Sequence, residues 1–271
     1  MDLGLSDKVV IVTGGAGAIG SAAAARFLEE GAIVVLGDRD EGKLRSIAGN
    51  LLSRYPGRVD SRLLDLADEA NSRAFVRAAI KSRGGIDCIV NNAAVFYFEK
   101  LVDWGSLDPL DEHYQVGLRG PATLVQECWR QSDRSRSGSV VNISSVAGHV
   151  AEPNAVAYTT IKAAQKGLTL SCSIEMAEYG GWAVSISPGH TWTPVHQGRA
   201  KAEGMTREEY EASQPHIQSS MIGRFLDPEE VASWIVLAAS PFGKALTGQD
   251  IKVTGGIEAG GFNRSYKTAV D

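Results

Sequence analysis

A tyrosine and a lysine stand four positions apart in the stretch YTTIK, as Tyr158 and Lys162. The preceding residues, AEPNAVA, are typical of a loop, and the following residues, AAQKGLTLSCSIEMAE, are typical of a helix. Side chains at positions i and i+4 lie on one face of a helix, so the phenol and the ammonium group can meet. Such a pair can take the proton of an alcohol, if the phenol is made acidic enough.

The acidity of the phenol decides whether this chemistry works. A free tyrosine has a pKa near ~10, so it is a poor base at neutral pH. Lowering that pKa by ~2–3 units requires about 3–4 kcal/mol of differential stabilisation. One ammonium group at about 4 Å supplies roughly 4 kcal/mol at an effective dielectric constant near 20. The sequence therefore predicts that Lys162 lowers the pKa of Tyr158.

A serine pair precedes the tyrosine. Ser144 and Ser145 end an apolar run, and 158 − 145 = 13 positions separate Ser145 from Tyr158. In an open parallel sheet, chemistry takes place outside the carboxyl ends of the strands. A neutral hydroxyl such as that of Ser145 can donate a hydrogen bond to a developing oxygen without taking over the proton transfer.

A glycine-rich turn, TGGAGAIG at 13–20, lies near the start of the chain between a β-branched run and a helical pattern. Glycines let backbone N–H groups approach a pyrophosphate at a helix N-terminus, and the residues expected to do so are Gly14, Gly17, Ala18 and Ile19. Asp38 follows after 38 − 20 = 18 positions, close to the ~20 typical of a carboxylate that binds the adenosine ribose. That carboxylate would repel a 2′-phosphate, although Arg39 beside it could attract one. NAD is therefore favoured over NADP.

Strand-like runs alternate with helical patterns along the whole chain. The runs are 8–14, 32–38, 59–65, 86–92, 138–145, 182–189 and 248–256. This alternation predicts parallel strands joined by crossovers, and the apolar runs predict strands covered on both faces. We expect an α/β fold, a single Rossmann-type domain over 1–271 with a doubly wound sheet of about seven strands. The polar segment 190–224 predicts a small helical lid, and Asp227 with Pro228 predicts the start of the next helix.

The composition limits the remaining functions. The chain is 44% hydrophobic and 22% charged with a net charge of −5, so no overall field attracts nucleic acid, and the basic segment 130–138 is typical of a solvated loop. Its three cysteines and five histidines have no zinc-like spacing, so no metal site is expected. The acidic start does not match a signal peptide, and no apolar run approaches ~20 residues. We expect a cytoplasmic protein that does not cross a membrane.

Together these motifs resemble the classical short-chain dehydrogenase/reductase family. The resemblance runs from KVVIVTGGAGAIG through NNAA (91–94), NISSVAG, YTTIK and PGHTWT to TGQDIKVTGG. It implies a three-layer α/β sandwich and a homotetramer or homodimer. It also implies an oxidoreductase that uses NAD(H) to interconvert a secondary alcohol and a ketone.

The resemblance also implies a role for individual residues. Tyr158 would be the catalytic acid/base, Ser145 would hold the substrate oxygen, and Lys162 would bind the nicotinamide ribose. Further cofactor contacts would come from Asp65 and Leu66 at the adenine, Asn91 and Ala93 along the adenosine ribose, and Pro188, Gly189, Thr191 and Thr193 around the nicotinamide carboxamide.

Three positions depart from the family pattern. Ala18 and Ala94 stand where glycine is usual, and Gly117 stands where the family usually has asparagine. In the family this asparagine bends its helix and holds a water that contacts the lysine. Glycine can accept the bend but lacks the side-chain amide. Two hypotheses follow: a working enzyme, or a nicotinamide-binding protein with impaired catalysis that acts as a sensor or assembly partner.

Large side chains gather in the loops expected after the fourth, fifth and sixth strands. We predict that Phe96, His149, His190 and Trp192 line the substrate pocket. Such rings suit an apolar or cyclic small molecule. An enoyl reductase is less favoured, because those relatives space tyrosine and lysine more widely. A sugar-nucleotide epimerase is less favoured, because those relatives have a longer C-terminal domain.

Overall fold

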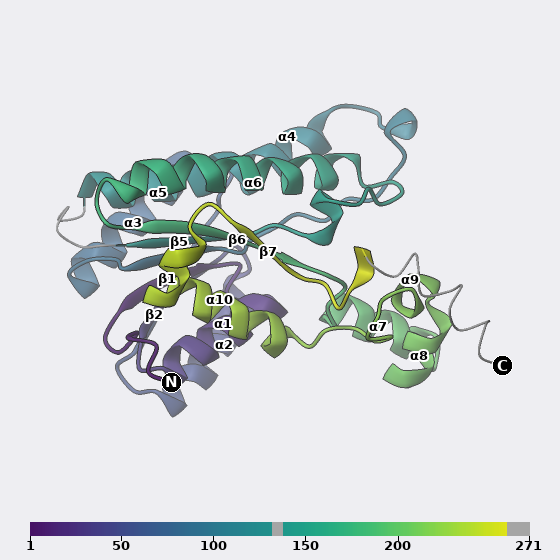
Figure 1. The fold of residues 1–271 in the computed structure, drawn as a ribbon, viewed down its shortest axis with the longest axis horizontal. Coiled ribbons are helices and arrows are strands. Elements are labelled where there is room, and N and C mark those ends of the chain that lie inside the picture. Colours follow the sequence, from purple (N-terminus) through teal and green to yellow (C-terminus); the bar gives the residue numbers. More distant parts are fainter. Residues whose placement is uncertain (132–137, 259–271) are drawn as a thin grey trace.

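A parallel β-sheet forms the centre of the computed structural model, which describes residues 1–131 and 138–258 (Figure 1). Its strands in this part of the chain are β1 (Val9–Thr13), β2 (Ile33–Asp38), β3 (Val59–Leu63), β4 (Cys88–Asn91), β5 (Ser139–Ile143), β6 (Trp182–Pro188) and β7 (Asp250–Val253). They lie in the order β3-β2-β1-β4-β5-β6-β7. The predicted doubly wound sheet is confirmed. Most of the basic segment 130–138 lies outside the described residues.

Helices cover both faces of the sheet (Figure 1). One layer contains α1 (Ala18–Glu29), α2 (Glu41–Arg54) and α10 (Pro228–Ala239), and the other contains α3 (Glu69–Arg83), α4 (Asp108–Tyr114), α5 (Gly120–Gln131) and α6 (Val156–Ala177). Along β1, Val10 and Val12 pack into the first layer, whereas Val9 and Ile11 pack into the second. Successive strand side chains point to opposite faces, so a strand covered on both faces must be apolar throughout.

The start of α10 follows its sequence signal. Asp227 and Glu230 form a reciprocal capping box, and Pro228 is the first helical residue. The cap satisfies N–H groups that have no partner within the helix. The predicted helix start is therefore confirmed, and it fixes where the chain returns to the sheet after segment 190–224.

The connection between α4 and α5 departs from regular helix geometry. Residues Gln115–Arg119 form a π-helical turn that contains Gly117. A Cβ added to Gly117 would lie 2.3 Å from Cγ2 of Ile161 on α6. This turn can therefore approach α6 only because residue 117 has no side chain. The predicted bend at this glycine takes the form of a π turn.

Segment 190–224, which the structure describes in full, contains the short helices α7 (Pro194–Ala202), α8 (Arg207–Ser213) and α9 (Pro215–Gln218). They gather beyond the ends of β6 and β7, on the right of Figure 1. Their apolar side chains Ala200, Tyr210 and Ile217 form a small core together with Phe225, the residue that follows the segment. The helical character agrees with the sequence, and the role of a lid stays a prediction.

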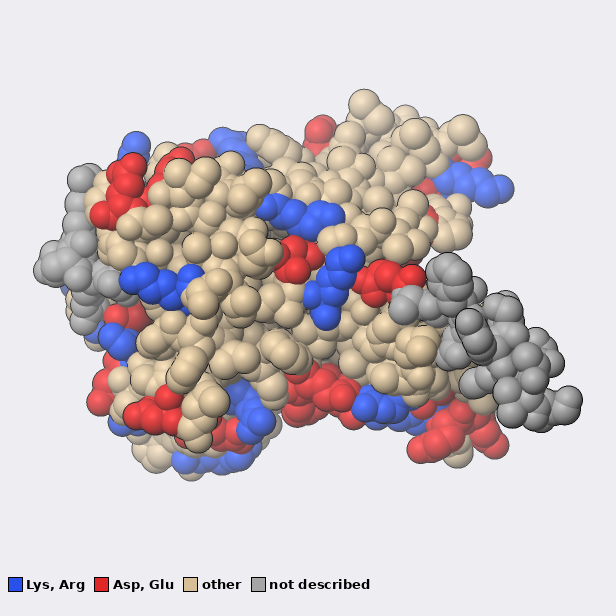
Figure 2. All heavy atoms as spheres, viewed as in Figure 1, with Lys and Arg blue, Asp and Glu red and all other residues tan. Residues whose placement is uncertain are grey.

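The surface carries charges of both signs. On the face in Figure 2, blue and red side chains are interspersed among larger uncharged areas. Over residues 1–131 and 138–258, no helix combines the length and the apolar character that a membrane span requires. The same ranges hold no group of three or more side chains suited to a metal ion.

Candidate active site

Two serines at the end of β5 have different tasks. The hydroxyl of Ser144 donates to the carbonyl oxygen of Lys162 at 2.6 Å and so ties α6 to the sheet. The Oγ of Ser145 accepts from the N–H of Ala147 at 3.1 Å, which begins a short 3₁₀ turn. The Ser145 hydroxyl also lies close enough to the Tyr158 phenol to favour the phenolate. The predicted pair of Ser145 and Tyr158 thus lies together at the carboxyl end of β5.

Burial dominates the acidity of Tyr158. It raises the pKa of the phenol to about 12, because the phenolate would lose its hydration. The hydroxyl of Ser145 opposes this rise, and the carboxylate of Glu152 adds to it. The phenol is therefore protonated at neutral pH in this structure, in contrast to the lowered pKa that the sequence predicted.

The amine of Lys162 points past the phenol toward the sheet. Its Nζ lies 5.6 Å from the centroid of the Tyr158 ring. It donates to the carbonyl oxygen of Ile143 at 2.6 Å and to Oε1 of Gln165 at 3.2 Å. Burial lowers the pKa of Lys162 to about 7, so the amine carries only part of a charge near neutral pH. Among the described residues the amine donates to these two oxygens and not to the phenol.

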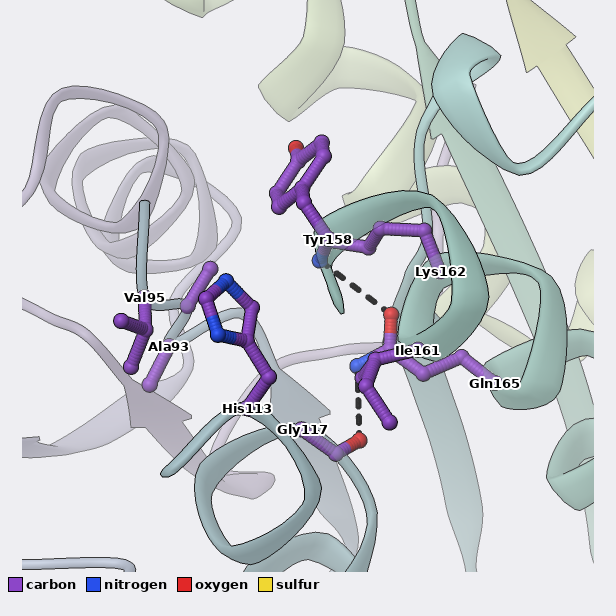
Figure 3. Close-up of a pocket in the computed structure, with 9 residues that line it drawn as sticks. Ala93, Val95, His113, Gly117, Tyr158, Ile161, Lys162 and Gln165 are labelled. Atoms are coloured by element: carbon purple, nitrogen blue, oxygen red, sulfur yellow. Dashed lines mark hydrogen bonds between the residues drawn. The ribbon is translucent and has the colours of Figure 1, made fainter. Parts of the chain in front are cut away.

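A glutamine lies between the lysine and the π turn. The Nε2 of Gln165 donates to the carbonyl oxygen of Gly117 at 3.0 Å, while its Oε1 accepts from Lys162 (Figure 3). Its side chain is almost fully buried. Gly117 itself has no side-chain amide to offer the lysine. The structure supplies that amide from α6, three positions after the lysine.

A small hollow opens beside these groups. It is lined by Ala93, Ala94, Val95, His113, Gly117, Tyr158, Ile161, Lys162 and Gln165. The His113 ring lies between the loop after β4 and Tyr158 (Figure 3), with its centroid 6.5 Å from that of the phenol. Its Nδ1 is 2.6 Å from the carbonyl oxygen of Pro109, so Nδ1 carries the proton. Among the described residues the buried Nε2 has no hydrogen-bond partner.

Aromatic rings from the loop after β4 cover Tyr158. The rings of Phe96 and Phe98 lie 5.3 and 5.8 Å from the phenol, centroid to centroid. Both phenylalanines remain exposed on their other side. Phe96, which the sequence predicted in the substrate pocket, thus stands at the mouth of the site.

The other predicted pocket residues have protein partners. The Nε2 of His149 lies 2.7 Å from a carboxylate oxygen of Asp250, so it holds its loop to β7. His190 packs against His216 at 4.6 Å between ring centroids, and burial lowers the pKa of His190 to about 4. Trp192 packs on Phe225 in the core of segment 190–224. Contact of these three with a substrate stays a prediction.

The glycine-rich turn comes close to the loop after β4. Gly14 has a φ of 63°, and a Cβ there would lie 2.9 Å from the Cα of Ala93. The side-chain amide of Asn92 donates to the carbonyl oxygens of Thr13 and Gly14 at 2.9 and 3.2 Å. Sequence reasoning missed Asn92, because a support for the turn carries no motif of its own.

The helix after this turn begins without a side-chain cap. Gly17 is the N-cap of α1, and no side chain of the described residues bonds the first-turn N–H groups at Ala18 and Ile19. Uncapped N–H groups at the N-terminus of a 12-residue helix suit an anion. The residues present therefore fit the phosphates of a dinucleotide.

A carboxylate stands beside the turn. One oxygen of Asp38 accepts from the N–H of Ala16 at 3.0 Å, and the other accepts from the N–H of Asp40. Arg39 is mostly exposed and forms an ion pair with Glu112 on α4 at 3.2 Å. Asp38 is thus held at the glycine turn, whereas Arg39 reaches toward α4.

The remaining predicted cofactor residues lie at or after the ends of β3, β4 and β6. They are Asp65 and Leu66, Asn91 and Ala93, and Pro188, Gly189, Thr191 and Thr193. The buried side-chain amide of Asn91 donates to Asn142 at 2.8 Å. The place of Asn91 along the adenosine ribose stays a prediction.

The comparisons with known proteins identify the family. A family model described as Enoyl-(Acyl carrier protein) reductase matches residues 14–258. The chain belongs to the short-chain dehydrogenase/reductase family. This dehydrogenase/reductase is 35% identical to L-fucose dehydrogenase from Bos taurus over 256 residues, which cover 93% of this chain and 90% of the relative. It is 32% identical to the 3-oxoacyl-acyl-carrier-protein reductase FabG of Thermotoga maritima over 258 residues, 93% of this chain and 98% of that one.

A solved structure supports the same conclusion. L-sorbose reductase from Gluconobacter frateurii, complexed with NADPH and L-sorbose, matches this short-chain dehydrogenase/reductase with a TM-score of 0.87. The two share 26% identity over 95% of this chain and 98% of the other. The protein is an alcohol/ketone oxidoreductase of this family and uses a nicotinamide cofactor.

Proposed function

We propose that the protein interconverts a secondary alcohol and a ketone with NAD(H), and that Tyr158 is its general acid/base. The observation that carries this proposal is that Ser145, directly after β5, and Tyr158, in the first turn of α6, lie close together at the carboxyl end of β5. Lys162 follows four positions later on the same face of α6. That short spacing supports alcohol chemistry over the enoyl reduction in the family model's description.

The residues divide the chemistry among them. When bound, the nicotinamide ring supplies or accepts the hydride. Ser145 donates a hydrogen bond to the substrate oxygen, and Tyr158 gives that oxygen its proton during reduction or takes it during oxidation. A phenol with a pKa of about 12 is protonated at neutral pH, as a general acid for ketone reduction must be. Lys162 and Gln165 lie behind the phenol and complete the polar part of the site.

The choice of NAD follows from Asp38. Its carboxylate is held at the glycine turn, where it can accept from ribose hydroxyls and would repel a 2′-phosphate. Arg39 reaches toward Glu112 instead, which weakens the argument for NADP. The related L-sorbose reductase, by contrast, was solved in complex with NADPH. The gap between NADH and NADPH affinity in this chain is therefore part of the test.

The proposed substrate is a small cyclic molecule with apolar faces. Phe96 and Phe98 offer ring faces beside Tyr158, against which the C–H groups of a ring can pack. Two of the relatives are named for sugars, L-fucose and L-sorbose. A panel of L-fucose, simple cyclic alcohols and a 3-oxoacyl thioester separates these classes.

The remaining parts of the proposal concern the whole chain. We propose that segment 190–224 covers the bound substrate as a lid, because it has its own small core beside the end of β6. We also propose a homotetramer or homodimer, as the family resemblance implies, and a location in the cytoplasm, as the composition and the start of the sequence indicate. Exposed apolar side chains on α6 support assembly.

Tyr158→Phe tests the proposal. This change removes the transferable proton and leaves the ring, so turnover should fall by at least about 10²-fold. NADH should still bind nearly as in the wild type, and more tightly than NADPH, in a fluorescence titration. Tyr114→Phe, at an exposed tyrosine of α4, is the matched control. Normal turnover in Tyr158→Phe would contradict the role of the phenol, and tighter binding of NADPH would contradict the choice of NAD.

A further inference from the structure

We infer that Gln165 is a positioning residue of the catalytic site, whose amide joins the Lys162 amine to the Gly117 carbonyl and keeps the amine oriented and charged. The inference rests on the proposed function, because the state of Lys162 matters only if Tyr158 performs proton transfer. It assigns a role to a residue that the sequence motifs do not include.

The geometry gives each end of the amide a matching partner. The Oε1 of Gln165 accepts from Nζ of Lys162 at 3.2 Å, and Nε2 donates to the carbonyl oxygen of Gly117 at 3.0 Å (Figure 3). Turning the amide over would set N–H against the amine and oxygen against the carbonyl. Only one orientation therefore satisfies both neighbours. With Ile143 accepting at 2.6 Å, two of the three N–H groups of the ammonium are held by described residues.

The main chain at Gln165 is tied to the sheet. The hydroxyl of Thr169 donates to the main-chain carbonyl oxygen of Gln165 at 2.9 Å. Asn142 on β5 donates to that hydroxyl at 2.8 Å, and Asn91 on β4 donates to Asn142 at 2.8 Å. Gln165 is only 1% exposed, so water does not compete for these bonds. The Oδ1 of Asn91 has no hydrogen-bond partner among the described residues, so this row of bonds fixes the main chain of α6 against the sheet, while Lys162 and Gly117 orient the glutamine amide.

The neighbouring residues explain why the amide comes from position 165. A Cβ on residue 117 would lie 2.3 Å from Cγ2 of Ile161, so an amide borne by residue 117 has no room. The same Cβ would lie 3.9 Å from Nε2 of Gln165. The glutamine amide thus reaches the region that a side chain at 117 would enter. This chain keeps an amide beside its lysine by placing it on α6 instead of on the π turn.

The electrostatics of the hollow show what this amide does. Burial opposes the charged form of Lys162, whose pKa is about 7. The titratable groups that share the lining are Tyr158 from α6 and His113 from α4, and no carboxylate lines it. From β5 the amine meets the Ile143 carbonyl. The carbonyls of Ile143 and Gln165 are therefore the dipoles that offset the loss of hydration, and losing one should shift the amine further toward its neutral form.

Two substitutions of opposite sign test the inference. Gln165→Met keeps the volume but removes both hydrogen bonds, so the pKa of Lys162 should fall by about one unit. Gln165→Glu places a negative charge beside the amine, so that pKa should rise. The readout is ¹³C NMR of protein labelled at lysine Cε, titrated with pH, with the Lys162 signal assigned by its loss in Lys162→Met. The alkaline limb of kcat/KM against pH should move in the same directions.

Thr169→Val is the matched control. It removes the two buried hydrogen bonds of the Thr169 hydroxyl, from Asn142 and to the main-chain carbonyl of Gln165, and leaves the side-chain contacts of Lys162 and Gln165 intact. It should lower stability without moving the lysine titration. If Gln165→Met and Gln165→Glu both lower stability while the titration stays at the wild-type pH, Gln165 is merely structural and the inference is overturned. Absence of wild-type turnover would refute the proposed function instead, and the NMR titration would still decide the role of Gln165. Should Gln165→Met fail to fold, the upward shift in Gln165→Glu carries the test alone.

Discussion

At the scale of single residues, burial pushes two neighbouring groups toward their neutral forms. The pKa of Tyr158 rises to about 12 and that of Lys162 falls to about 7. The charged forms are favoured only by hydrogen bonds, from Ser145 to the phenolate and from the ammonium to two carbonyl oxygens. A change in a few hydrogen bonds can therefore shift the protonation states of Tyr158 and Lys162.

Lys162 should make folding stability depend on pH. Its pKa is 10.5 unfolded and about 7 folded, so between these values the unfolded chain binds more protons and stability rises with pH. The contribution of Lys162 to folding stability is fully present above its unfolded pKa, and it is lost as the pH falls through 7. Between pH 7 and about 9.5, before tyrosines titrate, the gain is at most roughly 3 kcal/mol at ~1.36 kcal/mol per unit.

The expected result is a melting temperature that climbs over this pH window in the wild type and climbs less in Lys162→Met. Differential scanning calorimetry in matched buffers measures the slope. Lys81→Met, at an exposed lysine of α3, should keep the wild-type slope. An equal slope in Lys162→Met would refute the assignment.

At the scale of elements, the site depends on how closely the π turn meets α6. Gly117 lies against Ile161, and the glycine carbonyl receives the Gln165 amide. The extra residue of a π turn often marks a functional site in a helix. Here it lets the chain pass α6 while turning a carbonyl group toward the lysine side of that helix.

Gly117→Asn should therefore damage this protein, although asparagine is usual in the family. The new Cβ would overlap Cγ2 of Ile161, and such overpacking costs about 1–3 kcal/mol. Turnover should fall with it, because Ile161 or Gln165 must move. Adding Ile161→Ala should recover part of the loss, which a double-mutant cycle of denaturation free energies detects.

Gly167→Ala on α6 is the control, because a Cβ there meets nothing within 4 Å. It should be neutral or stabilising by about 0.5–1 kcal/mol. Wild-type stability and activity in Gly117→Asn would contradict this prediction, because the π turn would then have moved to make room for the new side chain.

At the scale of the whole molecule, α6 carries the active site on one side and apolar surface on another. Leu170 and Ile174 lie one turn apart on it and are 56% and 68% exposed. Large apolar side chains grouped on an outer helix are typical of a protein interface. Assembly through α6 would place a second subunit behind the catalytic residues.

Ile174→Glu should thus produce a smaller species than the wild type in size-exclusion chromatography with light scattering. A buried carboxylate without a partner opposes association strongly. Leu52→Glu, at an exposed leucine of α2, should leave the assembly unchanged. A monomeric wild type would rule out the proposed homotetramer and homodimer together.

Much of this architecture could be predicted from sequence, because it follows from short-range patterns. The strands, the glycine turn and the cap at Asp227 each depend on neighbours within a few residues. The direction in which a side chain reaches a distant element could not be predicted in this way. The sequence indicates a bend at Gly117, but nothing in it reveals that Gln165 would reach back to this glycine. His149 follows β5 as expected, yet its imidazole bonds Asp250, which is far away in the sequence.

The contact between Gly117 and Ile161 also restricts the order in which this chain can change. An asparagine at 117 is admitted only after residue 161 has become small, since the two side chains claim one space. While Ile161 is present, a change of residue 117 alone should pass through a damaged protein. The residue that a related chain carries at 117 should therefore depend on the size of its residue at 161.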